Sequence, residues 1–238
     1  MGVVVSYFSD TNVGQKMLLP QDNNSVKVNK PKLNKNLEGP NFTTLDYNKI
    51  YATRHYGRTV WASTIETNVN SVEEAWKRAR SRLNKYFNGK NQSGSKLPRT
   101  CPVTLRKPSG NSSSSSENTD VTISLPLPKA IAEDAPGPQH KQVYVCGEPK
   151  KIYYTGYFHK PFHEEDLHYN LTILRNKLRA NDEDFRDDFY QVVFYDTQKT
   201  NMRKLEYFEI WFEGRREEDD YICLQNYEES EEDIDDMD

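Results

Sequence analysis

The chain lacks the features that mark secreted, membrane-spanning or disulfide-rich proteins. It has only three cysteines among 238 residues, Cys101, Cys146 and Cys223, and no Cys-x-x-Cys pair. An odd number without that spacing argues against a disulfide framework or a zinc knuckle. No apolar run approaches the ~20 residues that span a bilayer, and the N-terminus has no charged lead before an apolar core. We therefore expect a cytoplasmic protein.

Sequence signatures of catalysis are also missing. There is no Gly-x-Ser-x-Gly and no Gly-x-Gly-x-x-Gly, and the stretch 84–90 lacks the first glycine of a phosphate-binding loop. His163 and His168 stand five residues apart, which turns their rings to different faces of a helix, whereas a zinc-binding His-Glu-x-x-His pair needs a spacing of four. The sequence predicts a protein that is not an enzyme.

Charge is unevenly distributed along the chain. Residues 215–238 hold two arginines and twelve acidic residues, a net charge of −10, so the total of −4 leaves +6 on residues 1–214. A basic body suits anionic ligands, and an acidic tail can screen that body or contact a protein partner. No recognised nucleic-acid-binding module accompanies the basic charge, so we expect no nucleic-acid partner.

Hydrophobic periodicity divides the chain into three parts. Residues 1–46 are rich in Asn, Lys and Pro and are expected to be disordered, as is the acidic tail 215–238. Between them, residues 47–214 read as two ββαββ-type repeats, which predict an α+β domain. The expected strands are 51–67 (two strands joined by a turn), 101–106, 121–127, 142–145 and 152–158 (as a strand pair), 189–196 and 206–213. The expected helices are 72–88 and 163–180.

The two helices carry the clearest local signals. Ser71 and Glu74 form a capping box, and Gly89 closes the first helix. In the second helix Leu167, Leu171, Leu174 and Leu178 share one face, a stripe that indicates core packing. The apolar positions of the first helix are Val72, Ala75, Trp76, Ala79, Leu83, Tyr86 and Phe87.

Seven stretches of the chain together resemble one known family. They are RHYGRTVWAST, LNKYFNGKN, CPVT, VTISLPLP, IYYTGYF, FYQVVFYD and YFEIWFEG, in this order, and the resemblance covers roughly Tyr47 to Gly214. The chain is similar to the SOUL or heme-binding protein family, specifically its histidine-bearing branch. That resemblance implies a distorted antiparallel β-barrel flanked by two helices, and a shallow surface groove for non-covalent heme b or protoporphyrin IX.

The sequence Arg54-His55-Tyr56-Gly57 reads as a turn, and it carries the candidate ligand residues. The resemblance implies that His55 is the axial ligand of heme iron; a neutral imidazole suits that role, and the alternative is an ordinary surface histidine in a turn. Arg54 and Arg58 could pair with the propionates, or they could be solvated charges. Tyr56 and Trp61 could line the ring, together with aromatic residues of 153–158.

Cys101-Pro102 offers an alternative iron ligand. Cys-Pro dipeptides can present a thiolate to ferric iron, yet a small thiol packed in a strand explains Cys101 more simply. It stands where the family resemblance leads us to expect alanine.

The N-terminus fits a myristoylation pattern. Met1-Gly2-Val3-Val4-Val5-Ser6 matches M-G-x-x-x-[ST], and the lysines between residues 27 and 35 could supply the electrostatic contact that a single acyl chain needs. Membrane contact is expected only if Gly2 is acylated.

Two functions remain open at this point. The first is non-enzymatic tetrapyrrole binding in a basic, aromatic groove with axial ligation by His55. The second is a protein- or membrane-interaction module on the same fold, for which heme binding would be incidental.

Overall fold

One antiparallel sheet and two helices make up the domain. The computed structural model describes residues 37–109, 119–196, 201–205 and 207–215. The acidic tail and Gly2 lie outside these residues, so the expectations about them stay predictions. The nine strands are ordered β1-β2-β7-β9-β8-β4-β5-β3-β6, and each is antiparallel to its neighbours.

The elements follow the predicted ββαββ order, with one additional strand at the start. The strands are β1 (Phe42–Tyr47), β2 (Ala52–Tyr56), β3 (Thr59–Val69), β4 (Val103–Pro108), β5 (Thr119–Pro126), β6 (Val143–Glu148), β7 (Lys151–Phe158), β8 (Phe189–Phe194) and β9 (Phe208–Glu213), and the helices are α1 (Val72–Phe87) and α2 (Leu167–Ala180). Because β1 begins at Phe42, within the segment expected to be disordered, the ordered domain begins earlier than predicted. The α+β class is confirmed.

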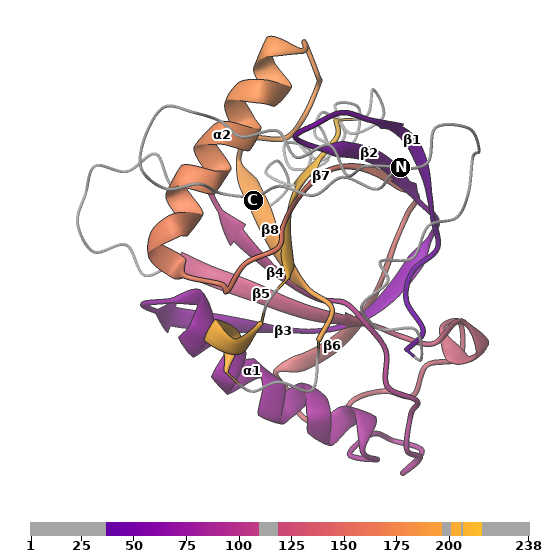
Figure 1. Cartoon of the computed structure of the whole chain (residues 1–238). Helices are drawn as coiled ribbons and strands as arrows, with labels where there is room; N and C mark the ends of the chain where they lie inside the picture. Colours follow the sequence, from indigo (N-terminus) through magenta and orange to yellow (C-terminus); the bar gives the residue numbers. More distant parts are fainter. Residues whose placement is uncertain (1–36, 110–118, 197–200, 206, 216–238) are drawn as a thin grey trace, which may run out of the picture.

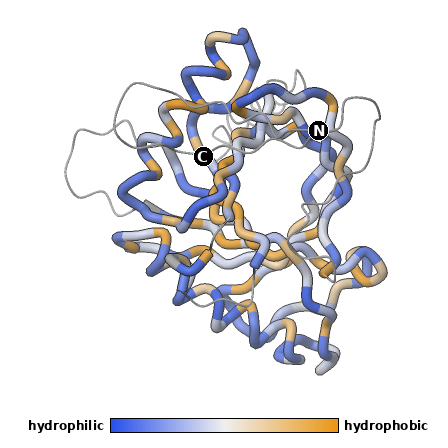
Figure 2. The backbone as a smooth tube through the Cα atoms, viewed as in Figure 1, coloured by the Kyte–Doolittle hydropathy of each residue, from blue (hydrophilic) through white to orange (hydrophobic). Residues whose placement is uncertain are grey.

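Helix α1 has the predicted start and end. The backbone N–H of Glu74 donates to Ser71 Oγ at 3.0 Å, and the Glu74 carboxylate accepts from the backbone N–H of Asn70 at 3.1 Å. Gly89 follows with a φ of +99°, a left-handed conformation that glycine adopts without strain. In α2 all four predicted leucines are buried. Both helices carry hydrophobic and hydrophilic residues interspersed along their length, as expected for amphipathic helices that pack on a sheet (Figure 2).

The strand pairing differs from the predicted one. β2 and β3 follow each other in sequence, yet β2 pairs with β1 and β7 whereas β3 pairs with β5 and β6. Tyr56 pairs with Lys151 and Thr59 with Glu148. The two strand–turn–strand segments β2–β3 and β6–β7 therefore lie side by side, with their turns next to each other. The predicted pair 142–145 with 152–158 is therefore wrong, because each of these strands pairs with a strand of the first repeat.

The sheet curves strongly, and both helices lie on its outer face (Figure 1). Its end strands are β1 and β6, and no ladder between the described residues joins them, so the expected closure into a barrel is not confirmed. Strand alternation gives two sets of packed side chains. A large core lies between the sheet and the helices, and a smaller one lies on the helix-free inner face. The inner cluster consists of Phe42, Tyr56, Cys101, Tyr153, Val193, Tyr195 and Trp211.

Candidate functional site

His55 lies within strand β2, not in a turn. It pairs with Thr43 on one side and with Ile152 on the other, so the turn after β2 is reduced to Gly57 and Arg58. Its side chain is half-buried, and no described residue hydrogen-bonds to the imidazole. Because Arg54 and Tyr56 belong to the inner face, alternation places His55 on the outer face. The imidazole is therefore partly exposed on the outer face.

Arg54 lies inside the curved sheet, where it forms a buried ion pair with Glu209 of β9. Its exposure is 5% and that of Glu209 is 0%. Arg54 Nη1 donates to Glu209 Oε2 at 2.9 Å and Nη2 donates to Oε1 at 3.2 Å, a two-pronged geometry that strengthens the pair. Burial alone would lower the pKa of Arg54, but the Glu209 carboxylate raises it well above its usual value. Arg54 is therefore permanently charged and committed to Glu209.

Three further donors satisfy the Glu209 carboxylate. The Tyr195 hydroxyl and Trp211 Nε1 donate to Oε2 at 3.0 and 2.6 Å, and the Tyr207 hydroxyl donates to Oε1 at 2.6 Å. Burial, followed by the nearby Glu209 charge, raises the pKa of both tyrosines. Sequence reasoning missed this network, which we call the Glu209 cage: Arg54, Tyr195, Tyr207, Glu209 and Trp211.

Tyr56 and Trp61 also belong to the interior. The Tyr56 ring lies 4.9 Å from the Trp211 ring and 5.0 Å from the Phe42 ring, centroid to centroid, and is 5% exposed. Trp61 is 6% exposed. Tyr56 lies on the opposite face of the sheet from His55, and Trp61 is buried. Neither ring forms one surface with the His55 imidazole.

Arg58 is the other accessible residue of the predicted set. Its side chain is 55% exposed and pairs with the exposed Glu133. Such an ion pair is weak in water and exchanges readily for another anion. Arg58 can therefore still meet a carboxylate ligand.

Cys101 is buried against the inner cluster, just before β4. Its exposure is 6%, and its Sγ lies 3.9 Å from the carbonyl oxygen of Leu37. A thiol so covered presents no surface to a planar ring. In the parts of the chain that the structure describes, no group of three or more His, Cys, Asp or Glu side chains converges as a metal site.

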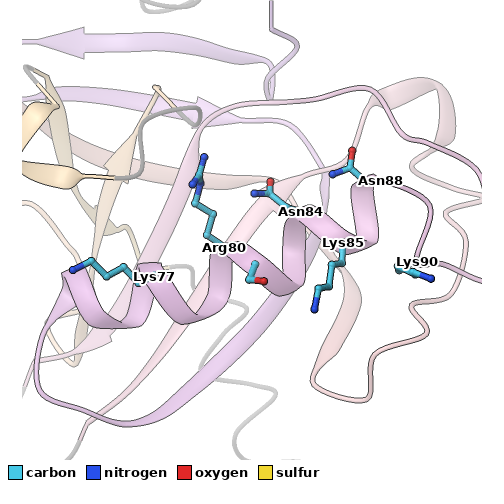
Figure 3. A pocket seen from close by; sticks show the side chains of 7 residues that line it. Lys77, Arg80, Asn84, Lys85, Asn88 and Lys90 are labelled. Atoms are coloured by element: carbon cyan, nitrogen blue, oxygen red, sulfur yellow. The ribbon is translucent and has the colours of Figure 1, made fainter.

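A basic hollow that the sequence analysis did not predict runs along the outer face of α1 (Figure 3). Its volume is about 570 Å³, and it is lined by Lys77, Arg80, Ser81, Asn84, Lys85, Asn88 and Lys90. No described acidic residue belongs to this lining. The signal was present as the polar stripe of an amphipathic helix, which sequence reasoning treats as solvated charge. We call this surface the α1 hollow.

A smaller depression adjoins the α1 hollow at Arg80 and Asn84. It is about 20 Å³ in volume and reaches Trp76, Phe87 and Arg99. The Arg80 guanidinium lies 5.9 Å from the Trp76 ring centroid, within the range of a cation–π contact. The two surfaces together combine positive charge with aromatic side chains.

These features define a class of protein: an α+β domain on one curved antiparallel sheet, with a buried ion pair among aromatic side chains inside the sheet and the accessible candidate ligand residues outside it. The family model for the SOUL heme-binding protein matches residues 37–213, and the chain belongs to that family. None of the helices among the described residues is long and apolar enough to cross a membrane.

Two curated relatives and one solved structure are similar to the chain. Heme-binding protein 2 of Mus musculus is 30% identical over 61% of this chain and 69% of its own length. Heme-binding protein 2 of Homo sapiens is 28% identical over 70% of this chain and 79% of its own length. The EcmrR–DNA complex in EcmrR-RPo is 13% identical with a TM-score of 0.50, covering 69% of this chain and 57% of that one. This last likeness concerns the fold alone.

Proposed function

We propose that the protein binds a heme-type tetrapyrrole, heme b or protoporphyrin IX, reversibly and without catalysis. The observation that carries the proposal is the family match over residues 37–213, together with relatives named for heme binding. The tetrapyrrole then binds on the outer surface of the domain, because the side chains of the Glu209 cage occupy the inner face of the sheet around Arg54.

His55 is the residue that fits heme iron best. Its imidazole is half-buried and makes no hydrogen bond to a described residue, and Ile152 of β7 stands beside it as a half-buried apolar neighbour. A neutral imidazole is a common iron ligand at cellular pH. Arg58, in the turn that follows this strand, is the accessible cation for a propionate. Arg54, Tyr56, Trp61 and Cys101 contribute only through the packing beneath, since all four are buried.

The α1 hollow is the alternative location for the ring. Its four cations could hold propionates. Figure 1 shows α1 and β2 at opposite ends of the domain, so one macrocycle does not contact both. We place the ring at β2, because only that surface offers an accessible histidine among the candidates for iron.

Replacing His55 separates iron ligation from ring recognition. His55→Ala is expected to shift the Soret maximum and to weaken ferric heme binding by about tenfold, equal to about 1.4 kcal/mol, while the affinity for metal-free protoporphyrin stays nearly unchanged. The measurement is a titration of the full chain with each compound, followed by absorbance. His168→Ala, which removes an exposed histidine of α2, is the matched control and should change neither titration. An unaltered heme spectrum in His55→Ala would rule out the axial role, and a shift in Cys101→Ser would assign it to the thiolate.

Neutralising the α1 hollow tests where the ring lies. Lys85→Gln combined with Lys90→Gln should leave both titrations unchanged at physiological salt, because these exposed lysines lie far from β2. If both ligands bind more weakly in this variant and His55→Ala affects neither, the tetrapyrrole lies along α1. If no form of the protein saturates at one ligand per chain, the interaction-module function replaces tetrapyrrole binding.

A further inference from the structure

The α1 hollow carries positive charge that the folded domain does not neutralise. Lys77 has an ion-pair partner in Glu73 at 3.3 Å, whereas Lys85 and Lys90 make no ion pair with a described residue. Lys85 and Lys90 are also exposed. The hollow therefore attracts an anion more strongly than a surface of alternating charges would.

The arginines closest to the end of the described chain are in a different situation. Arg215 pairs with Asp184 at 3.8 Å, Arg186 with Asp188 at 3.0 Å, and both Arg175 and Arg179 with Asp187. These four arginines therefore already have carboxylate partners. The α1 hollow differs in that several cations, two of them without an ion pair to a described residue, line one surface.

We propose that the acidic segment 217–238 docks in the α1 hollow of its own chain and covers Lys85 and Lys90. Complementary charge is the first argument, since residues 215–238 carry twelve acidic residues against two arginines. Reach is the second: an extended stretch of this length spans roughly 75 Å, and a domain of this size is roughly 40 Å across. Tethering adds a third, because a segment of the same chain is present at high effective concentration.

Docking of this kind has a functional consequence. The segment competes with any external anion for the hollow, so the outer face of α1 accepts such a partner only when the segment is displaced. Displacement is favoured by high salt, which screens the attraction. The proposal does not depend on tetrapyrrole binding, because it concerns a surface distinct from His55.

Zero-length carbodiimide cross-linking of the full chain tests the contact directly. The reagent joins a lysine to a carboxylate only when the two touch, and peptide mapping identifies the pair. At low ionic strength, links from residues 217–238 to Lys85 and Lys90 should exceed links to Lys49 and Lys150 several-fold, since those exposed lysines lie outside the hollow. The excess should disappear in about 0.5 M NaCl, where the Debye length is only a few ångströms.

Two controls complete the experiment. A chain whose acidic residues in 217–238 are changed to Asn and Gln tests charge, because other carboxylates of the domain should then give no excess at Lys85 or Lys90. A mixture of isotope-labelled and unlabelled chains tests whether the contact is within one chain, which requires linked peptides of a single isotope. Links spread evenly over the exposed lysines, no links at all, or predominantly mixed-isotope pairs would each overturn the proposal.

Discussion

Arg54→Met is expected to lower the free energy of unfolding by roughly 3–5 kcal/mol, because it leaves the Glu209 carboxylate buried without its counter-charge. Tyr195, Tyr207 and Trp211 would still donate to that carboxylate, but hydrogen bonds from neutral donors do not replace a charge. Urea unfolding followed by far-UV circular dichroism measures the change.

Arg58→Met is the matched control for this loss. It removes an arginine only four residues away whose ion pair with Glu133 is exposed, so the expected change is below about 1 kcal/mol. Arg54→Lys should fall between the two, because lysine keeps the charge and loses the two-pronged geometry. If Arg54→Met proves too unstable to purify, Arg54→Lys still provides the comparison. Equal losses in Arg54→Met and Arg58→Met would mean that the buried ion pair contributes little to stability, and a negligible loss in Arg54→Lys would mean that the two-pronged geometry contributes little.

Trp76→Ala is expected to destabilise the domain by roughly 3–5 kcal/mol and Leu171→Ala by roughly 2–5 kcal/mol. Trp76 is 4% exposed on the inner face of α1 and Leu171 is 6% exposed on that of α2, so each truncation leaves a cavity against the sheet. Thermal and urea unfolding report both changes.

Ser81→Ala is the control on the opposite, exposed face of α1, and it should change stability by no more than about 0.5 kcal/mol. A loss of that small size in Trp76→Ala as well would show that the inner face of α1 is not packed against the sheet.

Local sequence signals were sufficient for the limits of α1 and for the buried faces of both helices, whereas α2 begins at Leu167, four residues later than expected. The serine cap of α1 and the leucine stripe of α2 involve residues three or four positions apart, which one or two helical turns bring together. For the candidate site the same reasoning identified accessible residues, His55 and Arg58. It placed Arg54 with them because a turn was expected where β2 continues to Tyr56. In a strand, neighbouring residues face opposite sides, and this single difference separates His55 from Arg54.

The sequence by itself determined the order of both helices and of the strands from β2 onward, the buried faces of both helices and the resemblance to the SOUL heme-binding family, because these depend on the spacing of nearby residues and on motifs read in order. Only the tertiary structure decided which strands pair, and hence that Arg54 meets Glu209 across 155 positions of sequence and that the cations of α1 gather in one hollow. The physical reason is that antiparallel pairing depends on how distant strands bend and pack around a common core. Alternation within one strand gives its two faces and not its neighbours.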